Sequence, residues 1–169
     1  MRTVTVTWRP DHGRFEARGS HPVTIPVNAP HGDGPATGFS AAELLLAGAG
    51  SCSIWDIVEI MGKSRRELTG LEVQVVGEQA TDPPWPYQRL TLRFTIRGRG
   101  ITQSVAERAV ALSVERYCSV LATVRETASI ETEVVVEVDA TPPVTPDLGA
   151  AVDDDEPPAS DAGAIRGGH

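Results

Sequence analysis

Residues 39–61 read FSAAELLLAGAGSCSIWDIVEIM and predict one long helix. Ser40, followed three residues later by Glu43, matches a capping box, in which each side chain accepts a hydrogen bond from the other residue's backbone N–H. The residues that follow are apolar on most faces, which is typical of a helix surrounded by protein. We therefore expect a buried central helix that ends near Met61. Gly48 and Gly50 each cost about 1 kcal/mol relative to alanine, which predicts close approach by another segment.

Length and composition predict a single globular domain. The chain has 169 residues, of which 40% are hydrophobic and 22% are charged. We find no run of the roughly 18–20 apolar residues that would cross a bilayer, and the first ten residues lack the apolar core of a secretion signal. We therefore expect a cytoplasmic protein without a membrane segment.

The charge is unevenly distributed. Residues 140–169 hold six acidic residues against Arg166 and so carry −5 of the net charge of −8. Their Pro, Ala, Asp and Gly content cannot offset the entropy cost of ordering, so we expect a domain at 1–139 and a disordered tail at 140–169. The remaining body has no Lys/Arg stripe, which argues against nucleic-acid binding. The four histidines lie far apart, and we expect neither a metal site nor a cofactor.

Strands are expected on both sides of the helix. Val4, Val6 and Trp8 alternate with threonines, as in a half-buried strand, and residues 14–18 and 22–27 suggest two more short strands. Residues 28–38 form a loop rich in Gly, Pro and Asp. Residues 71–79 and 88–98 predict two further strands around a proline-rich loop, and the second should have one buried face and one exposed basic face.

Two helices and a strand are expected to complete the domain. Ser104 and Glu107 match a second capping box, which opens an amphipathic helix that reaches Tyr117. A helical pattern resumes after Cys118 with Ser119 as the expected cap, and residues 130–139 predict the last strand. The order of elements is α+β. Because the central helix has more apolar surface than one small sheet can cover, we expect an intertwined homodimer.

The two cysteines have competing interpretations. Free cysteine often behaves as a small buried hydrophobe, so Cys52 could be structural. Two cysteines are too few for a disulfide scaffold in a reducing compartment, so a functional pair would have to cycle. Cys118 either fills space at a helix break or lies before a helix N-terminus, where backbone amides favour a thiolate.

A nucleophilic Cys52 needs a nearby cation, because the thiolate is the reactive form. Asp56 lies one turn further on the same helical face and would raise the pKa of the thiol if it pointed there. The cation must then come from another segment. The candidates are Arg9, Arg14 and Arg18, of which Arg18 is the first choice.

These features together resemble the OsmC/Ohr family of osmotically inducible and organic-hydroperoxide-resistance proteins. The resemblance covers about residues 1–139. It rests on an acidic residue that opens the central helix, a cysteine nine residues later, and a second cysteine in YCSV after an amphipathic helix. The N-terminal arginine motif of the best-known peroxidase branch is not evident, which indicates a divergent branch.

The resemblance implies an OsmC-like fold, an interlocked homodimer with active sites at the subunit interface, and a cofactor-free thiol peroxidase. Cys52 would correspond to the peroxidatic cysteine, Cys118 to the resolving cysteine and Glu43 to a glutamate that orients the catalytic arginine. The substrate would be an organic hydroperoxide, and the reductant a thiol or dithiol. The apolar helix and Trp55 favour a hydrophobic pocket.

Two other functions stay open. A non-catalytic dimer could bind a small hydrophobic ligand in the same apolar cleft, with Trp85 as a possible contributor. A redox sensor could use the cysteine pair to switch a partner. Glu43 is compatible both with its capping role and with orienting an arginine.

Overall fold

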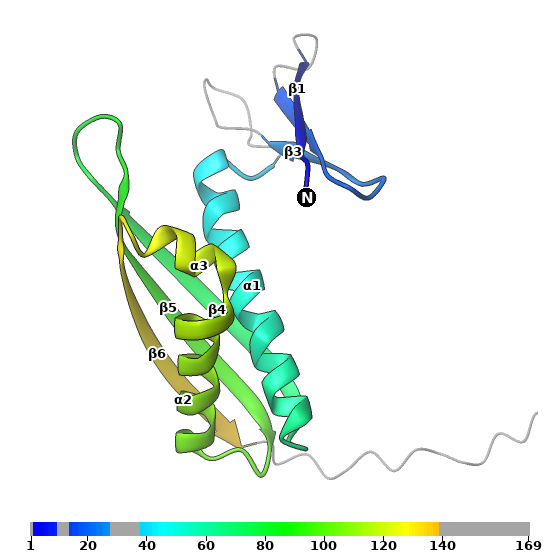
Figure 1. The fold of residues 1–169 in the computed structure, drawn as a ribbon, viewed down its shortest axis with the longest axis vertical. Coiled ribbons are helices and arrows are strands. Elements are labelled where there is room, and N and C mark those ends of the chain that lie inside the picture. Colours follow the sequence, from blue (N-terminus) through cyan, green and yellow to red (C-terminus); the bar gives the residue numbers. More distant parts are fainter. Residues whose placement is uncertain (1, 10–13, 28–37, 139–169) are drawn as a thin grey trace, which may run out of the picture. The chain divides into compact units, whose positions relative to one another are not determined.

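The order of elements along the chain is three strands, a long helix, two strands, a run of helices and a final strand (Figure 1). This computed structural model describes residues 2–9, 14–27 and 38–138, and the predicted tail and residues 28–37 of the predicted loop lie outside them. The elements are β1 Thr5–Arg9, β2 Arg14–Arg18, β3 Thr24–Val27, α1 Ala41–Lys63, β4 Glu67–Gln79, β5 Tyr87–Arg99, α2 Gln103–Leu112, the π-helical segment η2 Ser113–Tyr117, α3 Ser119–Val124 and β6 Ser129–Val138. The predicted α+β class is confirmed.

The second sheet has the order β4-β5-β6, and α1, α2 and α3 lie on one face of it (Figure 1). β4 is antiparallel to β5, whereas β6 is parallel to β5 and is reached through the helices, because parallel neighbours need a long crossover. The predicted alternation along β5 is confirmed, since every second side chain is buried under the helices: Leu90, Leu92, Phe94 and Ile96. These residues form the centre of the core.

The opposite face of this sheet carries a charge ladder. The predicted basic residues of β5 face glutamates of β6, with Arg93 Nε 2.8 Å from Glu133 Oε2 and Arg97 Nε 2.5 Å from Glu137 Oε2. Both pairs are about half exposed, so each contributes only about 0–1 kcal/mol. Because β6 neutralises the basic stripe, this face offers no extended positive surface for a polyanion.

α1 begins as the sequence predicts. The Glu43 carboxylate accepts hydrogen bonds from the Ser40 backbone N–H at 2.7 Å and the Ser40 hydroxyl at 2.8 Å, and Ser40 Oγ accepts from Glu43 N–H at 3.1 Å. The helix runs to Lys63, and Arg65 turns the chain in the left-handed region at φ 54°. The following strand begins at Glu67, four residues earlier than predicted.

The two glycines of α1 differ. A Cβ added at Gly50 would meet Val75 Cγ2 at 3.0 Å and Val73 Cγ1 at 3.2 Å, which confirms the close approach expected there. A Cβ at Gly48 would meet nothing within 4 Å. The same expectation was wrong for Gly48 within the described chain.

One face of α1 is buried and the rest is open in the single chain. Ala49, Ile57 and Met61 are at most 1% exposed, whereas Trp55 is 70% and Val58 45% exposed. The expectation of a helix covered on most faces is therefore wrong for the described part of the single chain. The expectation of no membrane-length apolar segment was also wrong, because α1 has 23 residues and contains an 18-residue stretch with a mean hydropathy of 1.5. The core helix of a globular protein meets the same criterion, and α1 packs on β4 and α2.

α2 begins two residues earlier than the predicted cap implies and has a different cap. Thr102, rather than Ser104, is the N-cap, and its hydroxyl accepts a hydrogen bond from Val105 N–H. Ile101, the residue before the cap, is buried in the core together with Ala106, which occupies the fourth position of the helix. This is the arrangement of a hydrophobic staple, and it fixes where the chain enters the helix.

The first sheet has the order β1-β2-β3 and a fully apolar face. The register pairs Trp8 with Phe15 and Val6 with Ala17, and directly opposed residues share a face. The prediction of a half-buried first strand was wrong for the single chain, because every residue of β1 is exposed. Trp8 is 64% and Val6 61% exposed, so the large side chains of β1 on this apolar face are not covered by the described part of the chain.

Candidate active site

Two thiols and a carboxylate meet where the C-terminal half of α1 packs against the junction of η2 and α3. Cys52 Sγ, Cys118 Sγ and a carboxylate oxygen of Asp56 all lie within 4.8 Å of one another. Cys118 is buried, whereas Cys52 and Asp56 are partly exposed. The structure therefore brings together the two cysteines that sequence reasoning singled out, although 66 residues separate them. Asp56 points toward them.

The π-helical segment sets the position of Cys118. Cys118 N–H donates to the Ser113 carbonyl oxygen, five residues earlier, at 2.9 Å. The backbone then becomes extended at Cys118, with φ −68° and ψ 102°, and α3 begins at the next residue. π-helical turns are rare in proteins overall, and those that do occur often lie at functional sites.

Cys118 itself caps α3. Its Sγ accepts a hydrogen bond from Leu121 N–H at 3.5 Å, so the prediction of Ser119 as the cap was wrong. The thiol enters the core while Ser119 stays exposed, because the apolar environment favours sulfur over a hydroxyl at the inward position.

The environment of Cys118 favours its neutral form. Burial raises the pKa of the Cys118 thiol, and the hydrogen bond and charge of Cys52 act in the same direction. Hydrogen bonds from Leu121 N–H and the Ser53 hydroxyl oppose this shift but do not reverse it. Cys118 is therefore a neutral thiol in the reduced protein rather than a preformed thiolate.

Two buried serines connect the helices at this site. Ser113 Oγ lies 3.2 Å from Asp56 Oδ2 and 3.1 Å from the Ser53 carbonyl oxygen, and it is the donor to both. Ser53 Oγ lies 2.8 Å from the Ala49 carbonyl oxygen and 3.7 Å from Cys118 Sγ. Sequence reasoning missed both serines. The sequence feature that could have indicated them is a polar residue at a position on the buried face of each helix.

Among the described side chains, Glu43 has no arginine partner of the kind predicted. The Glu43 carboxylate instead accepts hydrogen bonds from the backbone N–H and the hydroxyl of Ser40, and these bonds lower the pKa of Glu43. Arg18 is exposed at the end of β2, and Arg9 Nε lies 2.9 Å from Glu16 Oε2. The side chain of Arg14 lies outside the described part of the chain. Across residues 38–138 and the described N-terminal strands, no hydrogen bond or ion pair joins a guanidinium group to Glu43 or to the cysteine cluster.

An apolar groove of about 420 Å³ lies between α1 and β4. Apart from Ser51 at its edge, its α1 residues recur every three or four positions, as on one helical face: Glu43, Leu46, Ala47, Gly50 and Ile54. At about 100° per residue, Cys52 lies on the opposite side of the helix. The hydrophobic pocket expected beside Cys52 is therefore not this groove.

The fold and the family model agree on what class of protein this is. Residues 32–133 match the family model described as OsmC-like protein. This match spans more than half of the chain, and the protein belongs to the OsmC-like family.

Individual relatives show the same relationship. Protein YhfA of Escherichia coli is 37% identical over 81 residues, a match that covers 48% of this chain and only 60% of YhfA. A hypothetical protein from Aquifex aeolicus superposes with a TM-score of 0.72 at 26% identity, over 82% of this chain and 98% of that one. An organic hydroperoxide resistance protein from Elizabethkingia anophelis superposes with a TM-score of 0.61 at 15% identity, over 81% and 96% of the two chains, which is a likeness of fold.

Proposed function

We propose that this protein is a thiol peroxidase that reduces organic hydroperoxides to alcohols, with Cys52 as the nucleophile and Cys118 as the resolving thiol. The observation that carries the proposal is the meeting of the two sulfur atoms, which lie within 4.8 Å of each other on separate helical segments. The name of the Elizabethkingia anophelis protein supports the choice of substrate class. The roles follow from exposure, because Cys52 is open to a substrate and Cys118 is buried behind it.

The reaction uses the two electrons of the dithiol. The Cys52 thiolate attacks one oxygen of the peroxide, the O–O bond breaks, and the alkoxide leaves as an alcohol after taking up a proton. Cys52 is then a sulfenic acid. The Cys118 thiol attacks this sulfur, the S–O bond breaks, the hydroxide leaves as water with the proton of the thiol, and a disulfide remains for an external thiol or dithiol to reduce.

We further propose that the active protein is a homodimer. The apolar face of the first sheet and the side chains of Trp55 and Val58 on α1 are exposed in one subunit, and contiguous apolar surface of this kind marks an interaction site. A second copy would also supply the cation that the described intrachain contacts do not bring to Cys52. A monomeric mass by light scattering during size-exclusion chromatography would contradict this part of the proposal.

Intact mass after oxidation tests the chemistry. Reduced protein is mixed with an equimolar amount of cumene hydroperoxide and sampled over time. We expect the wild type to lose two hydrogens, Cys118→Ser to gain one oxygen on Cys52, and Cys52→Ser to stay unchanged. Wild-type protein that remains reduced under excess hydroperoxide would exclude the peroxidase.

A second function is favoured by the groove between α1 and β4. Its lining is predominantly apolar and includes Phe39, Leu46 and Ile54, as expected of a site for a small hydrophobic ligand. This function does not need the cysteines. A hydrophobic fluorescent probe should then bind Cys52→Ser as tightly as the wild type, whereas Ala47→Trp should fill the groove and weaken binding.

A further inference from the structure

We propose that Cys52, Asp56 and Cys118 of the reduced protein form a binding site for one zinc ion. The proposal goes beyond the peroxidase activity, because the carboxylate of Asp56 has no part in that reaction. Two sulfurs and a carboxylate oxygen form a ligand set that zinc prefers in proteins. The sequence gives no sign of it, because the ligands come from two distant segments rather than from a closely spaced motif.

The distances suit a tetrahedral ion. Zn–S bonds of about 2.3 Å and Zn–O bonds of about 2.0–2.2 Å put neighbouring ligand atoms roughly 3.6–3.8 Å apart. The three ligand atoms already lie within 4.8 Å of one another. Closing the site therefore requires movements of about 1 Å, which side-chain rotation of the partly exposed Cys52 and Asp56 can supply.

The charge of the cluster in the metal-bound state is also suitable. Zinc binds cysteine as thiolate, so metal binding releases the protons of both thiols, and the two thiolates and the carboxylate then carry three negative charges in a partly buried space. In the part of the chain that the structure describes, no arginine or lysine forms an ion pair with Asp56 or either cysteine. A divalent cation bound by all three groups would leave a net charge of −1.

Two serines hydrogen-bond to the proposed zinc ligands and hold them in place. Ser113 Oγ donates to Asp56 Oδ2 at 3.2 Å, which leaves the other carboxylate oxygen free for the metal. Ser53 Oγ lies 3.7 Å from Cys118 Sγ and holds that sulfur at the edge of the core. Hydrogen bonds of this kind orient metal ligands, and their loss costs about 10- to 100-fold in affinity.

The site has three protein ligands and an open side. Cys118 is buried, whereas Cys52 and Asp56 are partly exposed, so the ion enters from their side and keeps a water molecule as its fourth ligand. Zinc and hydroperoxide would compete for the same sulfurs. Formation of the Cys52–Cys118 disulfide would remove two of the three ligands, so only the reduced protein can bind zinc.

Metal titration of the full-length, reduced chain tests the proposal. The protein is freed of reductant without oxygen and titrated with Co²⁺ as a spectroscopic substitute for zinc, followed by Zn²⁺ competition against a chromogenic chelator. We expect one ion per chain, thiolate-to-cobalt charge-transfer bands and the visible bands of tetrahedral Co²⁺. Cys52→Ser should lose the charge-transfer intensity of one sulfur and bind zinc weakly.

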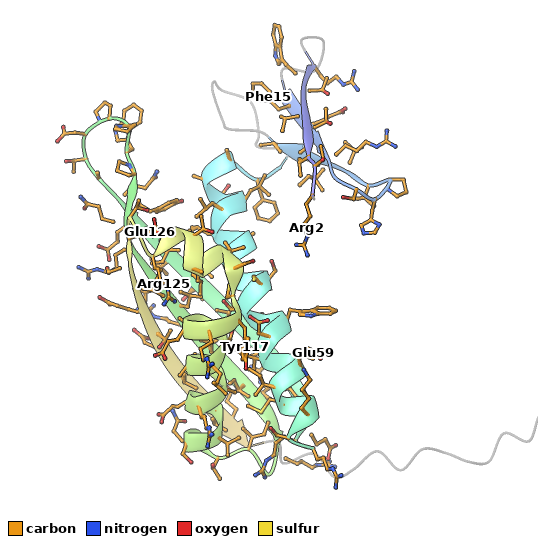
Figure 2. The ribbon with its side chains drawn as sticks, in the orientation of Figure 1. Arg2, Phe15, Glu59, Tyr117, Arg125 and Glu126 are labelled. Atoms are coloured by element: carbon orange, nitrogen blue, oxygen red, sulfur yellow. The ribbon has the colours of Figure 1, made fainter. Side chains whose placement is uncertain are left out.

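Asp56→Asn is the decisive variant, because it keeps the size of the side chain and an acceptor for Ser113. We expect its zinc affinity to fall by at least the 10- to 100-fold that loss of an outer-shell partner causes. Glu59→Gln is the matched control, since Glu59 lies on the same helix (Figure 2), pairs with Lys63 at 3.7 Å and is exposed. Its affinity should equal that of the wild type.

Two results would overturn the proposal. One is a wild-type chain that binds no zinc at micromolar concentrations, and the other is an Asp56→Asn variant that binds as tightly as the wild type. Far-UV circular dichroism of each variant checks that the fold is kept. The titration needs no peroxide and the mass experiment needs no metal, so failure of one proposal is distinct from failure of the other.

Discussion

Ser113 donates a hydrogen bond from its buried hydroxyl to the carboxylate of Asp56, with 3.2 Å between Oγ and Oδ2. The same hydroxyl lies 3.1 Å from the Ser53 carbonyl oxygen, so its single proton is shared between two acceptors on α1. The contact joins the π-helical segment to α1 across an otherwise apolar core. It also explains why the carboxylate points toward the two thiols instead of into solvent.

Replacing Ser113 by alanine should destabilise the protein. The change leaves a partly buried carboxylate without its donor, and loss of a hydrogen bond to a charged group costs about 1.5–3 kcal/mol. Urea denaturation followed by circular dichroism should show a free energy of unfolding lower by about this amount. Ser119→Ala is the control, because the Ser119 side chain is exposed and its loss should change stability by no more than about 0.5 kcal/mol. Equal stability of the two variants would contradict the role of Ser113.

The capping box of α1 should be visible in the pH dependence of stability. Hydrogen bonds from Ser40 lower the pKa of Glu43 below its ordinary value of 4.5, so the carboxylate stays ionised to a lower pH in the folded state than in the unfolded state. Its contribution is therefore complete above pH 4.5 and is lost as the pH falls through the lower, folded pKa. Glu43→Gln keeps a capping side chain but does not titrate, so the variant should lose less stability than the wild type between pH 5 and pH 3 in thermal melts. If both proteins lose the same stability between pH 5 and pH 3, the titration of Glu43 is not coupled to folding.

The N-cap itself should matter at neutral pH. Ser40→Ala removes the hydroxyl that accepts from Glu43 N–H, and loss of such a cap costs about 1 kcal/mol. The measurement is the shift of the urea midpoint at pH 7. Ser64→Ala at the other end of the helix is the comparison, since its hydroxyl bonds to the Ile60 carbonyl and caps no N–H. A shift no larger than that of Ser64→Ala would contradict the capping role.

The fold followed from local patterns that depend on few residues. The alternation of Leu90, Leu92 and Phe94 with arginines sets the two faces of β5, and the Ser40–Glu43 pair marks the start of α1. At α2 the same local rule failed, because Thr102 and Ser104 are both adequate caps. Thr102 is the cap because the residue before it, Ile101, is buried in the core. That burial depends on tertiary packing, which the local sequence does not show.

The candidate site was only partly accessible from sequence. Family resemblance paired Cys52 with Cys118, but the direction of the Asp56 side chain depends on Ser113, which lies 57 residues away. The cap at Cys118 likewise depends on a π-helical turn that no local propensity indicates. Local patterns do not specify contacts between distant segments, so the polar network around the cysteines appeared only in three dimensions.

The two glycines of α1 give a matched pair of stability tests. Gly48→Ala adds a methyl group where nothing lies within 4 Å, so the better helix propensity of alanine should stabilise the chain by about 0.5–1 kcal/mol. Gly50→Ala adds the same group 3.0 Å from Val75 Cγ2, so strain against β4 should cancel or reverse that gain. Urea denaturation of both variants measures the difference. A gain of equal size at Gly50 would mean that β4 does not pack as closely as the structure has it.

The apolar face of the first sheet provides the test of the proposed dimer. Val6 and Trp8 share this face with Phe15 and Ala17, whereas Thr7 lies on the opposite face of the same strand. If a second copy covers the apolar face, Val6→Lys removes about 1.5–3 kcal/mol of buried valine from each subunit and forces an ammonium group toward an apolar contact. The dissociation constant measured by sedimentation equilibrium should then rise by at least about tenfold, since 1.4 kcal/mol corresponds to a factor of ten. Thr7→Lys introduces the same charge on the other face and should leave the constant within about a factor of three. If Val6→Lys dimerises as tightly as Thr7→Lys, the subunits associate through a different surface, and the exposed face of α1 around Trp55 becomes the next surface to test.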